Sequence, residues 1–437
     1  MRFGPVVRGS LAVFVGLALA GCGAGQSGDG GGGSGGGSGK GPEQAAPKER
    51  VPKRYEAPLT FDTAKTVVLP ESAGAGKISM AGLQHPLPLV VDRGVVFIAR
   101  PDGVDVVSGY RHSDPVRITP EHEPLVRVED LGPIVGGNPA EAPVVAEHGG
   151  ERLVLSSLVA EVPGSGTTKG HQVVELVAVD PAQATKAWSV EIELGEGHYS
   201  VDDEETRVVG VHGGTAVVYA SGQLFGVDLG SHRKVWAAKG TYDVAPVLVG
   251  DTVVAATADM TDRETVGLSA ADGRERWRDT TVSVEGIAAA GPKTVMISGY
   301  DTKAEDDGGA LLDATTGKRL RSYGEGLTAD RCAYDGRKTV VCSSVGGDSA
   351  VAYDSATGKD RWVLPDEAET RVAPRVTLVR AGLVYGTTEN GPVVLDAETG
   401  ADKEDAPGIA PYVTDGSVGV ALDKDNNNAV TAYPVTG

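Results

Sequence analysis

The chain has 437 residues, of which 40% are hydrophobic, only 5% are aromatic and 62 are glycine. A core built from this composition must rely on Val, Ala and Leu, which favours many short strands. The formal net charge of -20 argues against nucleic-acid binding, because phosphate contacts require clustered Lys and Arg. We therefore expect no nucleic-acid partner.

The N-terminus has the pattern of an export signal. Arg2 and Arg8 precede an apolar run that ends in Leu19-Ala20-Gly21-Cys22. The run is shorter than the ~20 residues of a membrane-spanning helix, so it is typical of a secretory signal peptide. Its ending resembles the lipobox of bacterial lipoproteins. The resemblance implies that residues 1–21 are removed, that the Cys22 thiol receives the lipid, and that palmitate-type acyl chains hold the mature protein on a membrane.

A low-complexity segment follows the cysteine. Residues 23–41 are mostly glycine with interspersed serine, and such a sequence cannot bury enough surface to offset its ordering entropy. We expect residues 22–56 to be the lipidated cysteine and a flexible tether. A coil of this length has a root-mean-square reach of roughly 30 Å, which would hold the folded part clear of the lipid.

An internal repeat organises the rest of the chain. Near copies of an Asp-x-x-Thr-Gly motif begin at Asp313, Asp354 and Asp396, about 42 residues apart. With this aspartate as the anchor, the remaining equivalent positions are Asp105, Asp180, Asp228, Ser269 and Tyr433. A glycine recurs four residues after the anchor where a turn needs positive φ, and we assign this role to Gly109, Gly273, Gly317, Gly358, Gly400 and Gly437.

The tryptophans support the alignment independently, because all four in the chain lie eight residues after an anchor position. They are Trp188, Trp236, Trp277 and Trp362. Upstream of each anchor, two Val-rich runs flank a short turn, as in Val247-Leu248-Val249 and Val253-Val254-Ala255 around Gly250-Asp251. Each repeat is thus predicted to contain four strands, as in a propeller blade.

The anchor aspartate, the Thr-Gly-Lys that follows and the tryptophan eight residues on resemble the blade signature of the quinoprotein-type (PQQ-like) β-propellers. The match is complete from Asp354 to Trp362, whereas Ser113, Arg321 and Glu404 stand at tryptophan positions. The resemblance implies an all-β fold in which the tryptophan of one blade packs on the backbone of its neighbour. It covers residues 57–437.

The number of anchors predicts eight four-stranded blades, with seven as the alternative. The chain ends where the last blade should begin its fourth strand, so we expect Thr66-Val67-Val68-Leu69 to supply that strand and close the ring. The surplus between the first two anchors is assigned to a flexible loop around residues 164–170 of the second blade.

Cys332 and Cys342 remain after Cys22 is assigned to lipid. In an oxidising compartment a hairpin turning at Gly336-Arg337-Lys338 would make them cross-strand partners, which favours a disulfide over two reduced thiols. A short closed loop of this kind contributes about 2–3 kcal/mol.

No catalytic, cofactor-binding or metal site is assigned. The eight histidines show no spacing typical of a metal-binding pair, and we interpret them as surface residues on turns. Glu121-His122-Glu123 has no partner that spacing can identify. Residues 423–428 begin like a calcium loop, but Asn428 replaces the required glycine and Pro434 the bidentate glutamate, so a polar turn is favoured.

The hypothesis that best fits these features is a non-catalytic module that binds or scaffolds an envelope protein or ligand on the extracytoplasmic face of the cell membrane. In anchor and blade type it resembles the propeller lipoproteins of the outer-membrane barrel-assembly machinery. The alternative is a propeller enzyme, such as a lactonase, a lyase or a quinone-dependent dehydrogenase, with a site over the central channel. A third hypothesis is a sensor or assembly factor for a membrane partner.

Overall fold

A computed structural model describes residues 52–74, 87–126, 140–194, 206–258, 263–324, 328–344 and 346–437. The chain divides into two compact units, Met1–Lys48 and Glu49–Gly437, and the description below concerns the second. In the described residues no helix is long and apolar enough to cross a membrane.

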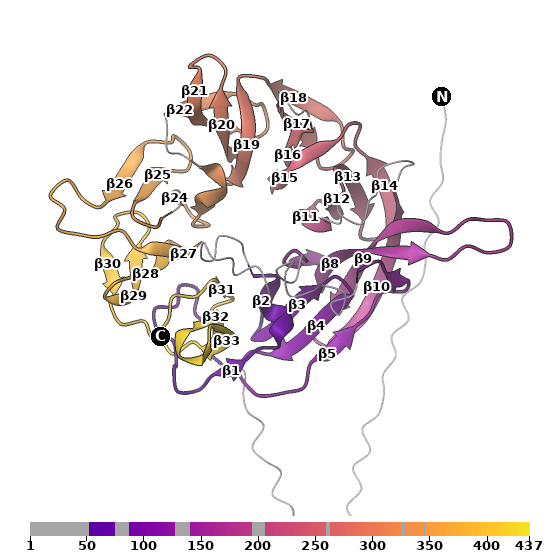
Figure 1. The fold of residues 1–437 in the computed structure, drawn as a ribbon, viewed down its shortest axis with the longest axis horizontal. Helices are drawn as coiled ribbons and strands as arrows, with labels where there is room; N and C mark the ends of the chain where they lie inside the picture. Colours follow the sequence, from indigo (N-terminus) through magenta and orange to yellow (C-terminus); the bar gives the residue numbers. More distant parts are fainter. Residues whose placement is uncertain are drawn as a thin grey trace, which may run out of the picture. The chain divides into compact units, whose positions relative to one another are not determined.

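The second unit is an all-β propeller of eight antiparallel sheets, which we number as blades 1 to 8 (Figure 1). This confirms the predicted fold class and decides for eight blades over seven. Blade 1 contains β2 (Leu89–Asp92), β3 (Val95–Arg100), β4 (Gly103–Ser108) and β5 (Val116–Ile118). Blade 2 contains β6 (Glu123–Pro124), β7 (Val144–His148), β8 (Glu151–Val162), β9 (His171–Asp180) and β10 (Thr185–Glu193).

The next four blades each have four strands in sequence order. Blade 3 contains β11 (Thr206–His212), β12 (Thr215–Ala220), β13 (Gln223–Asp228) and β14 (Arg233–Ala237). Blade 4 contains β15 (Tyr242–Val249), β16 (Thr252–Thr257), β17 (Thr265–Ser269) and β18 (Glu275–Asp279). Blade 5 contains β19 (Val282–Ala289), β20 (Thr294–Asp301), β21 (Asp306–Asp313) and β22 (Arg319–Tyr323). Blade 6 contains β23 (Cys332–Tyr334), β24 (Thr339–Ser343), β25 (Ala350–Asp354) and β26 (Asp360–Leu364).

Blade 7 contains β27 (Arg375–Arg380), β28 (Leu383–Thr388), β29 (Gly391–Asp396) and β30 (Asp402–Glu404). Blade 8 contains β31 (Val413–Thr414), β32 (Val418–Asp423) and β33 (Ala429–Pro434), and its fourth strand is β1 (Val67–Val68). The described residues also contain the short 3-10 helices η1 (Glu71–Ala73), η3 (Ala329–Arg331) and η4 (Lys424–Asn426).

The N-terminal strand closes the ring as predicted. Val67 pairs with Ala432 and Val68 with Thr431, so β1 completes the sheet of the last blade. Upstream of β1, Phe61 forms an isolated bridge with Val435. This closure removes the open edge that β33 would otherwise present to solvent.

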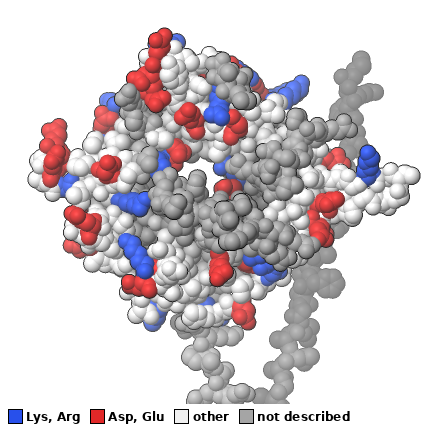
Figure 2. All heavy atoms as spheres, viewed as in Figure 1, with Lys and Arg blue, Asp and Glu red and all other residues white. Residues whose placement is uncertain are grey.

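The ring has two faces, because the connections of an up-and-down blade alternate between its two ends. The turn face carries the connections from first to second strand, such as Gly250-Asp251, and from third to fourth strand, such as residues 314–318. The connector face carries the connections from second to third strand and from each blade to the next. Acidic side chains lie at several places around the rim in Figure 2.

The predicted inner hairpins are confirmed in register. Val247 pairs with Val254, Val91 with Val96 and Val413 with Val420. Buried side chains from these strands form eight apolar clusters, one at each seam between neighbouring blades. Val, Ala and Leu dominate most of these clusters, as the composition predicts, whereas the cluster at the seam of blades 7 and 8 also contains Phe61, Tyr385 and Tyr433.

Blade 2 differs from the expectation of a flexible loop. The residues around Gly164–Gly170 form the end of a hairpin in which β8 and β9 continue to pair as far as Val162 and His171, and Ser165 bridges Thr168. This hairpin extends outward from the ring (Figure 1). The additional residues between the first two anchors therefore form a regular hairpin and the segment that contains β6, which pairs with the C-terminal end of β8.

Two anchor positions were placed wrongly. The anchor aspartates of blades 5 to 7 are the last residues of their third strands, opposite the first residue of the second strand, as in Asp313 opposite Thr294. In blade 1 this position belongs to Ser108, which lies opposite Val95, and in blade 8 it belongs to Pro434, opposite Val418. Asp105 and Tyr433 lie within their strands. Gly109 and Gly437 accordingly lack the positive φ assigned to them.

Candidate functional site

The anchor aspartates cap the turn that follows the third strand. Asp354 Oδ1 accepts hydrogen bonds from the Thr357 amide (2.9 Å) and the Thr357 hydroxyl (2.8 Å). Asp313 and Asp396 make the same contacts with their own threonines. Hydrogen bonds to the ionised carboxylate, together with Arg361, hold the pKa of Asp354 below its ordinary value although burial opposes this shift. These aspartates shape turns.

The position four residues after the anchor adopts a left-handed conformation in blades 2 to 7. It is glycine in blades 4 to 7, for example Gly400 at φ +71°. In blades 2 and 3 the same position is held by Ala184 and His232, each at φ 52°. The turn geometry therefore persists where glycine is absent, at a cost in backbone strain that glycine avoids.

Tryptophans link neighbouring blades at three seams. The indole N–H of Trp236 donates to Ala270 O of the next blade (3.1 Å), Trp277 donates to Ala314 O (2.9 Å), and Trp362 donates to Ala397 O (2.9 Å). Each ring also lies against the left-handed glycine of the next blade, so that an added Cβ at Gly317 would come within 2.6 Å of Trp277. This is the neighbour packing that the family resemblance implied.

Trp188 and Arg321 serve two other seams differently. Trp188 stacks on His232 of blade 3, with ring centroids 4.5 Å apart and planes 22° apart. At the seam of blades 5 and 6, Arg321 replaces tryptophan, donates to Gly358 O and pairs with Asp360 at 2.9 Å. Tyr323 donates to the same carbonyl at 3.3 Å. The acceptor is again a backbone carbonyl in the turn of the next blade.

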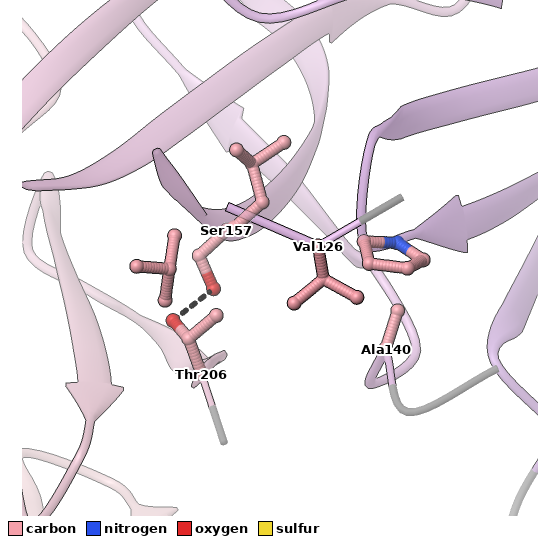
Figure 3. Close-up of a pocket in the computed structure, with 7 residues that line it drawn as sticks. Val126, Ala140, Ser157 and Thr206 are labelled. Atoms are coloured by element: carbon pink, nitrogen blue, oxygen red, sulfur yellow. Dashed lines mark hydrogen bonds between the residues drawn. The ribbon is translucent and has the colours of Figure 1, made fainter. Parts of the chain in front are cut away.

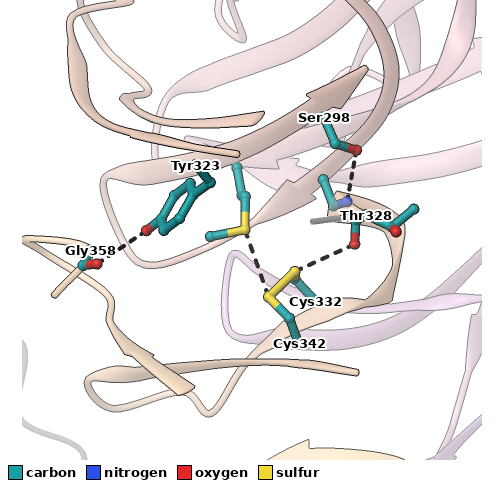
Figure 4. Close-up of a disulfide and its surroundings, with 8 residues drawn as sticks. Ser298, Tyr323, Thr328, Cys332, Cys342 and Gly358 are labelled. Carbon is teal, nitrogen blue, oxygen red and sulfur yellow. Dashed lines mark hydrogen bonds between the residues drawn. A yellow bond between two sulfur atoms is a disulfide. The ribbon is translucent and has the colours of Figure 1, made fainter. Parts of the chain in front are cut away.

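Cys332 and Cys342 form the predicted disulfide (Figure 4). They are directly opposite residues of β23 and β24, and both are buried. Met296 of blade 5 contacts Cys342 with the two sulfur atoms 3.8 Å apart. The bond therefore joins the inner two strands of blade 6 inside the seam to blade 5.

The residues considered for acid–base or metal chemistry have structural contacts. Glu175 is fully buried, and its carboxylate accepts hydrogen bonds from the amides of Glu121 (2.6 Å) and His122 (3.1 Å). The His122 ring lies 2.6 Å from Glu191. Residues 424–426 form η4, whose preceding residue Asp423 accepts from the Asp425 amide, which is the polar turn that the sequence favoured.

Within the described ranges, no group of three or more His, Cys, Asp or Glu side chains is arranged to hold a metal ion. Four histidines lie in or beside connections of the turn face, namely His112, His148, His212 and His232. Cys22, His85, His198 and the acidic run at residues 202–205 lie outside the described residues.

A small cavity lies where blades 1, 2 and 3 meet (Figure 3). Its volume is about 30 Å³, and it is lined by Val126, Ala140, Ser157 and Thr206 among others. The Thr206 hydroxyl donates to Ser157 Oγ at 3.0 Å. As bounded by the described residues, a space of this size has room only for a few water molecules.

A larger cleft of about 550 Å³ lies at the seam between blades 7 and 8. Its volume falls within the range of ~300–1,000 Å³ typical of small-ligand sites. Thr377, Thr387 and Pro392 line it from blade 7, and Ala421 and Tyr433 line it from blade 8. Sequence reasoning missed this cleft.

The short fourth strand of blade 7 explains why the cleft exists. β30 pairs only with Val394 and Leu395, and the chain then leaves the blade. At Pro407 the chain contacts the N-terminal segment, where the Phe61 amide donates to Pro407 O at 2.9 Å. Ile409 and Ala410 are buried there and line the cleft, so they form its floor. Two sequence signals could have indicated this cleft: Glu404 stands at the tryptophan position, and Pro407 follows it after only three residues.

The comparisons with known proteins agree with the blade repeat. Residues 171–323, from the first residue of β9 to the last of β22, match a family model described as "Outer membrane protein assembly factor BamB". Blades 2 to 5 thus carry the matched segment, and the molecule contains a PQQ-like β-propeller repeat domain. No curated protein matches this chain.

Several solved structures are similar to it. BamB from Moraxella catarrhalis is 18% identical, with 59% of this chain and 78% of that chain covered and a TM-score of 0.33. Hydrazine synthase from Kuenenia stuttgartiensis is 15% identical, with 71% and 95% covered and a TM-score of 0.40. The β-propeller domain of Cps50 (Swd1) from Myceliophteria thermophila is 10% identical, with 61% and 93% covered and a TM-score of 0.36.

Proposed function

We propose that the protein is a lipid-anchored, extracytoplasmic β-propeller that acts as a non-catalytic binding or scaffold module for an envelope protein. The match of blades 2 to 5 to the assembly-factor family carries this proposal. The proposed organisation is a signal peptide at residues 1–21, the lipidated Cys22 and a tether to residue 56, and the propeller at residues 57–437. Arg54 and Tyr55 already contact blade 8, so the free tether would end just before them.

The architecture suits a scaffold. Anchor aspartates and tryptophans are used for turns and seams, and the disulfide and β1 hold blades 6 and 8. A ring fixed at so many seams presents its faces and rim in a constant geometry. Preorganisation of this kind lowers the ordering cost of association.

The anchor can be tested by metabolic labelling. Cells that produce the tagged protein would be fed an alkyne analogue of palmitate, and the tagged protein would be isolated from the membrane fraction. We expect label on the wild-type chain, and with Cys22→Ser we expect neither label nor membrane retention. Label that persists on the Cys22→Ser chain would contradict lipid attachment at this residue.

The scaffold role can be tested by chemical cross-linking on intact cells, followed by purification through a C-terminal tag and mass spectrometry. We expect one enriched envelope protein whose yield falls in the Cys22→Ser chain, because loss of the anchor removes the effective concentration that the membrane supplies. Recovery of bulk membrane proteins alone, in equal amounts from both chains, would contradict the proposal.

A further inference from the structure

The two ends of the cleft between blades 7 and 8 carry opposite charges. Arg375 is the first residue of β27, the innermost strand of blade 7, and Tyr412 precedes β31, the innermost strand of blade 8. Asp423 and Asp425 lie farther out, where β32 passes into η4. The inner end is therefore lined by a guanidinium group, and the outer end is lined by two carboxylates beside the ammonium group of Lys424.

The influence of these charges on the two cleft tyrosines agrees with this placement. Burial raises the pKa of Tyr412, and the positive charge of Arg375 opposes that shift. Burial, together with the negative charges of Asp423 and Asp425, raises the pKa of Tyr433 to about 12. Arg375 thus acts on the inner tyrosine, and the two aspartates act on the outer one.

Two hydroxyl groups along the cleft can bond to a ligand. In the described part of the chain, neither the half-buried Tyr412 hydroxyl nor the Thr387 hydroxyl makes a hydrogen bond. Thr66 from the N-terminal segment lines the cleft near its outer end. A ligand can replace water at such partly exposed hydroxyls, so these groups are compatible with an occupant that has hydrogen-bonding groups along its length.

The edge of blade 7 beside the cleft favours an extended occupant. Among the described residues, residues 391–393 of β29 pair with β28 on their inner side, whereas β30 pairs with the outer side of β29 only at Val394 and Leu395. Pro392 in this stretch lines the cleft. Exposed strand edges bind extended chains, and side-chain pockets then provide specificity.

We propose that the cleft binds a short extended peptide segment of the partner protein, with an acidic side chain toward Arg375 and Tyr412 and a basic side chain toward Asp423 and Asp425. The inference rests on the proposed function, because it specifies how the scaffold holds its partner. Charge complementarity at both ends would fix the direction of the peptide in the cleft.

The direct test measures fluorescence polarisation of labelled hexapeptides with the full-length chain in detergent. One peptide carries Glu near one end and Lys near the other, a second has the order reversed, and a third carries Gln at both positions. We expect one of the charged orders to bind about 10-fold more tightly than the neutral peptide, and less so at high salt. Equal binding of all three peptides, or binding of a neutral oligosaccharide instead, would overturn the proposal.

Variants with matched controls assign the binding to the cleft. Asp425→Lys should weaken the preferred peptide by about 5-fold, because it turns an attraction into a repulsion. Glu305→Lys makes the same change in the exposed connection between β20 and β21 of blade 5, and it should leave binding unchanged. Equal effects of the two variants would show that peptide affinity responds only to the net charge of the protein, and would refute the cleft as the binding site.

A filling variant gives an independent check. Thr387→Trp should abolish peptide binding by occupying the cleft, whereas Thr315→Trp, at an exposed position of a blade 5 turn, should not. Thermal melting of both variants verifies that they fold, and the surface change Asp425→Lys keeps the test valid if Thr387→Trp does not.

Cross-linking in cells separates this inference from the proposed function. If the Thr387→Trp chain captures the partner as well as wild type does, the cleft is not the docking site, although the scaffold role stands. If wild type captures no partner, the proposed function itself fails, whatever the peptides do.

Discussion

The seam between blades 6 and 7 and the seam between blades 7 and 8 are closed by different means. At the first seam, Trp362 donates to Ala397 O and lies against Gly400 of the next blade. At the second, Glu404 occupies the tryptophan position, and Phe61 from the N-terminal segment packs among the buried side chains instead. The difference teaches that the repeat motif joins two blades through one tryptophan, whereas the seam without that tryptophan is filled in part by Phe61 and also contains the cleft.

Among the predicted changes, truncation of Phe61 in the N-terminal segment should have the largest effect on the free energy of unfolding. Phe61 is only 6% exposed, and its ring lies against Gly419, so Phe61→Ala should lower the free energy of unfolding by about 3–5 kcal/mol. Urea denaturation followed by far-UV circular dichroism measures the change. Val68→Ala, at a side chain of β1 that is 46% exposed, is the control and should change little. A loss below about 1 kcal/mol for Phe61→Ala would show that the Phe61 side chain is not needed to stabilise this seam.

The tryptophan seam should respond almost as strongly. Trp362→Ala removes a partly buried ring and its hydrogen bond, and we expect a loss of about 3 kcal/mol. Trp362→Phe keeps most of the ring and should cost about 1–2 kcal/mol, largely for the unpaired Ala397 carbonyl. Equal losses for the two variants would mean that the indole N–H contributes everything and the ring packing nothing.

The disulfide should contribute an intermediate amount. We expect Cys332→Ala with Cys342→Ala to lower the free energy of unfolding by about 2–3 kcal/mol, because the bond closes a short loop. Reduction of the wild-type chain should shift the urea midpoint in the same direction, and the double variant should be insensitive to the reductant. A double variant that still responds to the reductant would contradict this assignment.

Two substitutions at equivalent left-handed positions should have opposite signs. Gly400→Ala places a Cβ 2.9 Å from Trp362 at φ +71°, so a loss of about 1–2 kcal/mol is expected. Ala184→Gly relieves strain at φ 52° and should be neutral or stabilising by up to about 1 kcal/mol. Thermal melting of the two variants against wild type is sufficient, and two losses of similar size would contradict the strain argument.

The smallest expected effect is a pH dependence at Asp251 on the turn face. The hydrogen bond from Arg276, more than any other contact, lowers the pKa of Asp251 to about 2. A carboxyl group whose pKa is lowered by folding stabilises the fold at pH values above the ordinary aspartate pKa. This contribution is lost as the pH falls from about 4 to about 2. Asp251→Asn should therefore flatten the acid limb of the stability curve slightly, since the side chain is 45% exposed. An unchanged acid limb would show that the pair contributes nothing.

The sequence was a good guide wherever the repeat is regular. The repeat at Asp313, Asp354 and Asp396 predicted the blade type, and the count of eight anchor positions predicted the number of blades although two anchors were misplaced. The incomplete last blade predicted strand closure by residues 66–69. The Cys332–Cys342 pair followed from the same hairpin logic.

The sequence failed where local patterns compete with the repeat. Asp105 resembles an anchor, but it is a buried residue within β4 that pairs with Arg117, and Ser108 takes the anchor position. The packing of Phe61 at the seam and the shape of the cleft depend on contacts between segments more than 300 residues apart, such as the hydrogen bond from Tyr385 to Pro58 O. No short-range periodicity reports such contacts.

The path of the N-terminal segment also determines how the ring would respond to force. The Arg54 side chain donates to Asp415 O, and the Tyr55 amide donates to Gly416 O at 2.7 Å, on the turn face and ahead of every strand pair of β1. A pull at the N-terminal end therefore loads these contacts and the Leu59 amide before it reaches Val67. These contacts would therefore bear a load applied at the N-terminal end before the β1 strand pairs that close the ring.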